Sequence, residues 1–280
     1  MKTKLRMALM ALMALMCTST ALLAQAPKGE IMGSAVVHDA TSAKAVVAGA
    51  QVALPASVTG GAAFLGAFRD LPAPTSGSVP VVLLLHGSSG LGLAAIGEWQ
   101  RWLAGQGIAS IAPDSFGLAG RLTYKSPIDK ESYEKVHALR ASEIGLALDA
   151  LRGVPWADKG RLVLAGSSEG SPAVARHGGE GFVARMIFAW SCEDNYFVQS
   201  HRTAIAGEQP VLNVISSTDP FFSAANAWLG NPAAKGHCGT ALKGNSRVSI
   251  VLLPDAPHTL INLPAARQAV SGFLKEVLAR

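Results

Sequence analysis

The segment Arg161-Leu-Val-Leu-Ala-Gly-Ser-Ser-Glu-Gly-Ser171 decides the fold that the sequence predicts. Its residues 162–165 are apolar or small and predict a short buried strand. Residues 166–170 fit G-x-S-x-G, and Pro172 follows at a position where the first turn of a helix tolerates proline. A strand, a tight turn and a helix in this order are what a nucleophile elbow requires. We therefore expect Ser168 to be exposed above a sheet edge; the alternative is a Gly/Ser-rich turn without chemistry.

Other apolar segments of strand length surround this one and alternate with helical patterns. Strands are predicted at 79–86, 108–112, 185–191, 210–216 and 247–254, and helices at 94–105, 129–152 and 263–280. The strands are apolar enough to be covered on both faces, which is typical of a mostly parallel central sheet flanked by helices on both faces. In residues 27–78, short runs at 35–38, 45–47 and 50–53 predict edge strands and an antiparallel beginning to the sheet.

Length and composition favour one globular α/β domain over residues 27–280. The chain has 280 residues, of which 49% are hydrophobic and 15% charged, so it can fill a large core. The formal net charge of +5 includes Lys2, Lys4 and Arg6; without these three, 21 basic residues face 19 acidic ones. No basic cluster interleaved with aromatic residues is present, which argues against nucleic-acid binding.

Residues 1–26 have the pattern of a secretory signal peptide. The three basic residues precede an apolar run at 7–16, and Ala24-Gln25-Ala26 resembles an A-x-A cleavage site. Pro27 disfavours cleavage after Ala26, so a cut after Ala24 is the alternative. An uncleaved membrane anchor is a second alternative, although 18–20 (Thr-Ser-Thr) dilute the apolar run. We expect a bacterial exported protein, periplasmic or secreted, with no membrane attachment after signal removal.

Two cysteines remain after signal removal, Cys192 and Cys238. In an oxidising compartment such a pair favours a disulfide, which in the chain-entropy model stabilises a chain by about 4 kcal/mol for a loop of this length. The alternative is two unpaired thiols. A metal site with His201 and His237 is conceivable, but no ligand spacing supports it, and we expect no metal.

Three residue types needed for acyl transfer follow predicted strands. Ser168 lies in the elbow, Asp219 lies in the turn just after the strand at 210–216, and His258 lies in the loop after the last strand. Because ligands meet the carboxyl ends of parallel strands, these side chains should converge. The order Ser, Asp, His is that of α/β-hydrolases, and it predicts nucleophile, acid and base respectively. Glu193, Asp194 and Asp255 are rival acids.

A second turn, His86-Gly87-Ser88-Ser89-Gly90, follows the strand at 79–86. Its small residues predict outward-pointing N–H groups, and the N–H groups of Ser88 and Glu169 are the candidates for an oxyanion hole. A dinucleotide-binding loop is disfavoured because its glycines would follow G-x-G-x-x-G, whereas here they fall at 87, 90 and 92. We expect no cofactor.

These motifs together resemble the dienelactone hydrolase-like family of α/β-hydrolases over roughly residues 79–278. The resemblance is carried by the elbow, 86–90, 112–117 (Ala-Pro-Asp-Ser-Phe-Gly), 217–219 (Ser-Thr-Asp) and 257–260 (Pro-His-Thr-Leu). It implies Ser168 as nucleophile, Asp219 as acid and His258 as base. The enzymes that give the family its name have a cysteine at the nucleophile position and an acidic residue where Gly87 stands, so this chain resembles a serine variant.

The sequence thus predicts an exported serine hydrolase, carboxylesterase-like, that cleaves a small-molecule ester through an acyl-enzyme. A catalytically silent binding protein of the same fold and an acyltransferase are the alternatives. Segments 117–128 and 221–246 are expected to form pocket walls, with Glu169, Arg121 and Lys125 as polar groups near the pocket mouth. Arg140 is expected to pair either with Glu169 or, in solvent, with Glu143. The natural substrate, the role of the Glu169 side chain and the oligomeric state stay open.

Overall fold

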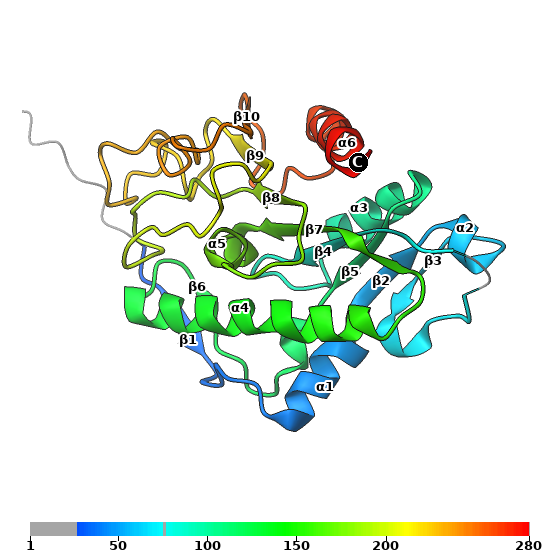
Figure 1. Cartoon of the computed structure of the whole chain (residues 1–280). Helices are drawn as coiled ribbons and strands as arrows, with labels where there is room; N and C mark the ends of the chain where they lie inside the picture. Colours follow the sequence, from blue (N-terminus) through cyan, green and yellow to red (C-terminus); the bar gives the residue numbers. More distant parts are fainter. Residues whose placement is uncertain (1–26, 75–76, 280) are drawn as a thin grey trace, which may run out of the picture.

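A computed structural model describes residues 27–74 and 77–279, so the predicted signal peptide at 1–26 lies outside the described residues. An eight-stranded sheet in the order β10-β9-β8-β7-β4-β5-β2-β3 forms its centre (Figure 1). The strands are β2 (Gln51–Leu54), β3 (Phe64–Ala67), β4 (Val79–Leu85), β5 (Ala109–Ala112), β7 (Ala157–Ser167), β8 (Ala184–Phe188), β9 (Val211–Ser216) and β10 (Val248–Leu253). Neighbours from β10 to β5 are parallel, whereas β2 is antiparallel to β5 and β3. The predicted mostly parallel sheet is confirmed.

Helices cover both faces of this sheet (Figure 1). Helices α4 and α5 pack with one cluster of buried side chains, and α3 and α6 pack with the other. The helices are α1 (Ala40–Ala48), α2 (Ala56–Thr59), α3 (Ala94–Gly105), α4 (Lys130–Arg152), α5 (Ser171–Arg176) and α6 (Pro264–Leu278), with short 3-10 turns η1 (Phe68–Asp70), η2 (Ser115–Gly117) and η3 (Ser168–Gly170). A separate antiparallel pair joins β1 (Glu30–Met32) to β6 (Thr123–Lys125).

The central strand β4 shows why the sheet needs helices on both sides. Val81, Leu83 and Leu85 face the α4 and α5 cluster, and Val82 and Leu84 face the α3 and α6 cluster. All five side chains are fully buried. Because alternate side chains of a strand point to opposite faces, a strand that is apolar at every position is stable only between two layers.

The N-terminal part of the domain differs from the expectation. The segment 45–47 lies inside α1 and not in a strand, and 35–38 forms only one isolated bridge, Ala35 with Arg121. Asp39 caps α1 by accepting hydrogen bonds from the N–H groups of Thr41 and Ser42, and this local signal decides for a helix. The prediction at 50–53 is confirmed by β2, as is the antiparallel edge of the sheet.

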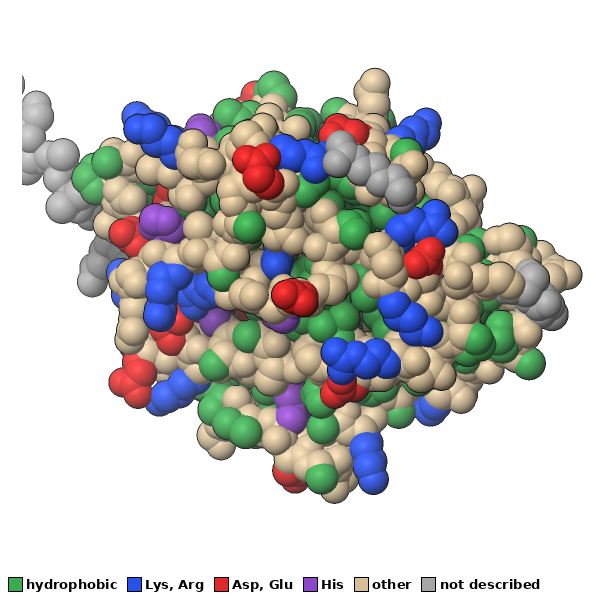
Figure 2. Space-filling model, viewed as in Figure 1, with side chains coloured by type: hydrophobic (Ala, Val, Ile, Leu, Met, Phe, Trp, Pro, Cys, Tyr) green, Lys and Arg blue, Asp and Glu red, His purple; other side chains and the backbone are tan. Residues whose placement is uncertain are grey.

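On the face drawn in Figure 2, basic and acidic side chains are interspersed and do not gather by sign. In residues 27–74 and 77–279, no helix is both long and apolar enough to span a membrane.

Candidate active site

Ser168 lies on a sharp turn between β7 and α5. Its φ is +52°, a left-handed conformation that a serine adopts only where the surrounding structure enforces it. The flanking glycines allow this turn through close approach. A Cβ on Gly166 would lie 2.7 Å from the Gly170 carbonyl oxygen, and one on Gly170 would lie 2.3 Å from the Leu85 carbonyl oxygen. The expected strand, turn and helix are therefore present, and the two glycines are required by packing.

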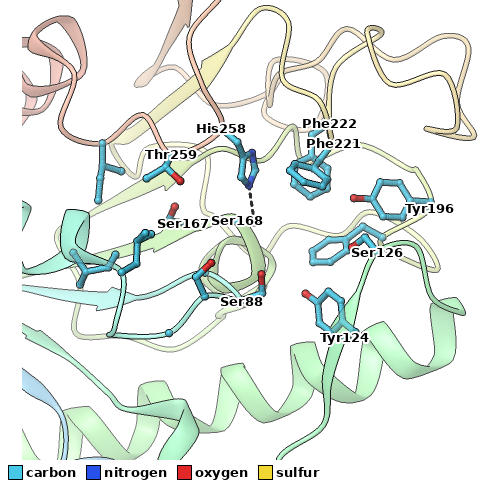
Figure 3. A pocket seen from close by; sticks show the side chains of 17 residues that line it. Ser88, Tyr124, Ser126, Ser167, Ser168, Tyr196, Phe221, Phe222, His258 and Thr259 are labelled. Atoms are coloured by element: carbon cyan, nitrogen blue, oxygen red, sulfur yellow. Dashed lines mark hydrogen bonds between the residues drawn. The ribbon is translucent and has the colours of Figure 1, made fainter. Parts of the chain in front are cut away.

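Three side chains from different strand ends form a hydrogen-bonded chain at this turn. His258 Nε2 lies 2.9 Å from Ser168 Oγ (Figure 3). On its other side, His258 Nδ1 lies 2.7 Å from Asp219 Oδ2. The Asp219 side chain is fully buried, whereas the His258 side chain is 21% exposed. The geometry brings together the three residues predicted from strand ends, although they are 51 and 39 positions apart in the sequence.

Asp219 is held in place by its own loop. Its Oδ1 accepts hydrogen bonds from the N–H groups of Phe221 and Phe222, at 2.9 and 3.0 Å. Oδ2 is therefore oriented toward His258. Two of the rival acids have other partners. Asp255 accepts from the Thr218 hydroxyl, and Glu193 accepts from the N–H groups of Lys235 and Gly236. The third, Asp194, accepts from the N–H of His201.

The turn that contains Ser88 lies directly beside Ser168. Strands β4 and β7 are neighbours, with Leu85 paired to Gly166, so the two turns leave the sheet side by side. A Cβ on Gly87 would lie 3.3 Å from the Ser168 Cβ. This adjacency is what an oxyanion hole from the N–H groups of Ser88 and Glu169 needs. Their role as donors stays a prediction.

The Glu169 side chain points away from the pocket mouth, so the expectation of a charge there is wrong. Glu169 is fully buried, and its Oε1 accepts a 2.5 Å hydrogen bond from Arg121 Nη2. Arg140 Nε lies 3.7 Å from the same oxygen. Arg121 is itself only 5% exposed, and Lys125 pairs at the surface with Glu30. Glu169 and Arg121 therefore do not line the pocket. A carboxylate buried beneath the elbow is stable only with cations as partners, so the two side chains pair with each other in the interior.

Arg140 makes both pairings that the sequence left as alternatives. Besides the approach to Glu169, its Nη1 donates to Glu143 Oε2 at 2.6 Å, and both side chains are fully buried. The expected solvent-exposed pair is therefore wrong, because α4 turns this face toward the sheet. Arg140 Nη2 also donates to the His86 carbonyl at 3.0 Å. Arg140 thereby links the end of β4 to the residue after Ser168.

His86 lies beneath the turn, as a structural residue. Its ring is fully buried, and burial, followed by the nearby Arg140 charge, lowers the pKa of His86 well below its ordinary value. A neutral imidazole is therefore expected there.

A pocket with a volume of about 190 Å³ opens in front of Ser168 (Figure 3). Tyr124, Ser126, Phe221 and Phe222 line it, which agrees with the two segments expected to form its walls. Sequence reasoning missed the contribution of residues 196 and 197, Tyr and Phe, from the long connection after β8. The only available signal was their aromatic character in a loop that follows a strand end.

Cys192 and Cys238 form a disulfide, in agreement with the favoured expectation. It ties the connection after β8 to the segment between β9 and β10. Within 27–74 and 77–279, no group of three or more His, Cys, Asp or Glu side chains is arranged to hold a metal ion.

No protein-family model matches the chain, and no curated protein sequence matches it. Solved structures do match. Est1E from Butyrivibrio proteoclasticus aligns with a TM-score of 0.53 and 14% identity over 82% of this chain and 94% of that one. TT1662 from Thermus thermophilus aligns with a TM-score of 0.53 and 18% identity over 91% and 100%, and esterase PE8 with 0.50 and 18% over 74% and 96%. At these identities the likeness establishes an α/β-hydrolase fold.

Proposed function

We propose that this chain is a serine hydrolase that cleaves small carboxylic esters through an acyl-enzyme. The observation that carries the proposal is the hydrogen-bonded chain from Ser168 through His258 to the buried Asp219. The similarity in fold to a protein named as an esterase, PE8, agrees with it.

In the acylation step, Ser168 Oγ attacks the ester carbonyl carbon while its proton passes to His258 Nε2. Asp219 accepts a hydrogen bond from the Nδ1–H group of the imidazole, which keeps Nε2 available as a base and stabilises the imidazolium that forms. The N–H groups of Ser88 and Glu169 receive the negative charge on the carbonyl oxygen, and each such donor contributes roughly 3 kcal/mol to the transition state in comparable sites. The imidazolium then protonates the leaving alcohol.

In the deacylation step, water takes the place of the alcohol. His258 removes a proton from this water as it attacks the acyl carbon, and the same N–H groups stabilise the second oxyanion. Ser168 leaves with the proton that His258 returns, and the carboxylic acid is released.

We also propose that the protein acts outside the cytoplasm. The signal-peptide pattern at 1–26 supports this, and so does the Cys192–Cys238 disulfide, because disulfides persist in oxidising compartments.

The test uses a fluorophosphonate probe and mass spectrometry. A single phosphonyl adduct on Ser168 is expected in the wild-type protein, with no adduct in Ser168→Ala. Hydrolysis of p-nitrophenyl butyrate should fall by at least about 10³-fold in the same variant. If the folded wild-type protein forms no adduct, the proposed hydrolase activity is contradicted and a catalytically silent binding protein is favoured. Product analysis with added alcohol then separates an esterase from an acyltransferase.

A further inference from the structure

One side of the pocket in front of Ser168 is built from aromatic rings that come from three separate parts of the chain. They are Tyr124 of β6, Tyr196 and Phe197 after β8, and Phe221 and Phe222 after β9. Leu93, Ile96 and Ile261 line the pocket as well, and they are aliphatic. The pocket therefore has an aromatic wall, made of the five rings just named, and a smaller aliphatic part.

The rings of the aromatic wall hold one another in fixed positions. Phe197 lies 5.2 Å from Phe222 and 6.4 Å from Tyr124, measured between ring centroids. Tyr196 is stacked with Phe222 at 6.0 Å and 6°. Phe221 meets the His258 ring edge-to-face at 4.7 Å, so the wall reaches the imidazole. A preformed set of π faces and edges favours a planar aromatic group over a saturated group of the same size.

Hydroxyl groups interrupt this wall at defined places. In Figure 3 the Tyr124 and Tyr196 hydroxyls point toward the side of the pocket that holds Ser168. Ser126 also lines the pocket, and its Oγ accepts a 2.9 Å hydrogen bond from the Tyr133 hydroxyl, which orients it. Burial raises the pKa values of Tyr124 and Tyr196, so both phenols stay protonated. The Tyr124 hydroxyl is within hydrogen-bonding reach of the buried Glu169 carboxylate, which leaves the neighbouring hydroxyls of Tyr196 and Ser126 to meet a ligand. Donors within an apolar wall select a ligand with a matching polar atom on its ring.

The pocket volume indicates how large a part of a ligand the pocket can enclose. An apolar cavity of about 150 Å³ is sufficient for benzene. At about 190 Å³, this pocket accommodates one six-membered ring and a few further atoms. A long acyl chain or a fused ring system would extend beyond this volume, out of the pocket opening.

We propose that the substrate is a small ester with a single hydroxylated aryl ring, which lies against the aromatic wall while the ester carbonyl faces Ser168. This inference rests on the proposed function, because it assigns the substrate class of the same site. The ring belongs to either the acyl or the alcohol group of the ester. The other, shorter group of the ester then lies in the aliphatic part of the pocket.

The wild-type protein tests the proposal with two matched series of esters. In the acyl series, the methyl esters of 3-(4-hydroxyphenyl)propanoate, 3-phenylpropanoate and 3-cyclohexylpropanoate are compared. In the alcohol series, the acetates of 4-hydroxybenzyl alcohol, benzyl alcohol and cyclohexylmethanol are compared. In one series we expect kcat/KM to fall about tenfold from hydroxyaryl to aryl and again several-fold from aryl to cyclohexyl. Equal or faster turnover of the cyclohexyl ester in both series overturns the proposal.

For each variant, the ratio of the kcat/KM values of two esters does not depend on the amount of folded protein. Such ratios therefore show which side chains cause the preference for the aryl ester. Phe222→Leu should lower the aryl-to-cyclohexyl ratio about threefold or more. Phe273→Leu is the matched control, because Phe273 lies on α6 in the opposite core cluster and should leave that ratio unchanged. Tyr196→Phe should lower the hydroxyaryl-to-aryl ratio. An unchanged ratio in Phe222→Leu contradicts the placement of the ring.

Two readouts separate this inference from the proposed function. If the fluorophosphonate labels Ser168 but neither ester series shows a preference for the aryl ester, only the proposed substrate class is contradicted. Absence of labelling defeats the hydrolase; the aromatic site is then tested by calorimetry with 3-(4-hydroxyphenyl)propanamide and its cyclohexyl analogue on Ser168→Ala. About tenfold tighter binding of the hydroxyaryl amide supports the site, and equal binding overturns it.

Discussion

At the scale of single residues, Asp219 divides its two carboxylate oxygens between two tasks. Oδ1 receives the N–H groups of Phe221 and Phe222, and Oδ2 faces His258 Nδ1. Since both backbone groups are donors, the atom at the Oδ1 position must be an acceptor. If asparagine replaced Asp219, these two N–H groups would therefore determine that its side-chain oxygen faces them and its NH₂ group faces His258.

Replacing Asp219 by Asn should abolish most activity with little change in KM. The Asn oxygen must occupy the Oδ1 position, so its NH₂ group faces His258 and forces Nδ1 to become an acceptor. Nε2 then carries the proton and cannot accept one from Ser168. We expect kcat to fall about 10⁴-fold, measured by steady-state ester hydrolysis. The control is Asp255→Asn, an exposed acid three residues before His258, and a comparable loss there would contradict the assignment.

Glu169 is the buried counter-charge of two arginines. Together with Arg121, Arg140 and Glu143 it forms a buried cluster with two positive and two negative side chains. The cluster is neutral as a whole, which makes its burial tolerable.

Replacing Glu169 by Gln should destabilise the protein by about 3–5 kcal/mol, because it leaves an uncompensated guanidinium in the interior. The free energy of unfolding in urea measures this. Glu131→Gln is the matched control: Glu131 pairs with Lys135 on the exposed side of α4, and its loss should change stability by less than about 1 kcal/mol. Equal effects of the two variants would mean that the cluster contributes no more than a surface pair.

At the scale of elements, the elbow depends on the contact between β7 and β4. The turn after β7 crosses so close to the end of β4 that Gly170 has no space for a side chain. The atom in the way is the backbone carbonyl of Leu85, which cannot move aside like a flexible side chain.

Gly170→Ala should therefore slow the labelling of Ser168 by a fluorophosphonate and lower stability by about 1–3 kcal/mol or more. The physical cause is that the turn must shift away from β4, which carries Ser168 away from His258. Gly145→Ala is the control, because Gly145 lies within α4 and, apart from the adjacent backbone of that helix, no atom lies within 4 Å of the added Cβ. That variant should be neutral or stabilising by up to about 1 kcal/mol. Normal labelling in Gly170→Ala would contradict the packing argument.

At the scale of the whole molecule, the interior holds histidines that fold in the neutral form. Burial lowers the pKa values of His86 and His137, which are 0% and 2% exposed. In the unfolded chain both rings take up a proton below pH 6.5. The unfolded state then binds more protons than the folded state, so stability falls as the pH falls.

The free energy of unfolding should thus decrease between pH 7 and pH 5.5. Each neutral histidine contributes a slope of about 1.4 kcal/mol per pH unit below 6.5, until the pH reaches its folded pKa. Urea titrations at a series of pH values measure the slope. His137→Phe should reduce it, since one of the two rings no longer titrates. An unchanged stability over this range would contradict the neutral burial of both rings.

From residue 79 onward, the sequence by itself determined the order of the central-sheet strands and of the helices that flank them, but it missed β6, which pairs outside that sheet. It also indicated that Ser168, Asp219 and His258 come together. Apolar runs such as 81–85 are unambiguous because a strand buried on both faces leaves no polar position. Parallel strands bring their carboxyl ends to one edge, so the strand ends, with the G-x-S-x-G motif and the chain order, predicted that Ser168, Asp219 and His258 converge there. The prediction at 45–47 followed the short β-like run and overlooked the capping residue Asp39, so α1 was missed there.

Only the tertiary structure decided the environment of these residues. Whether Glu169 faces solvent or the interior depends on Arg121 and Arg140, which lie 48 and 29 positions away in the sequence and reach it through the packing of α4 and the loop before β6. The aromatic wall likewise combines three segments whose positions follow from chain folding and from no local pattern. The succession of strands and helices along the chain follows from short-range hydrophobic periodicity. The burial of a charge and the lining of a pocket depend instead on contacts between distant segments.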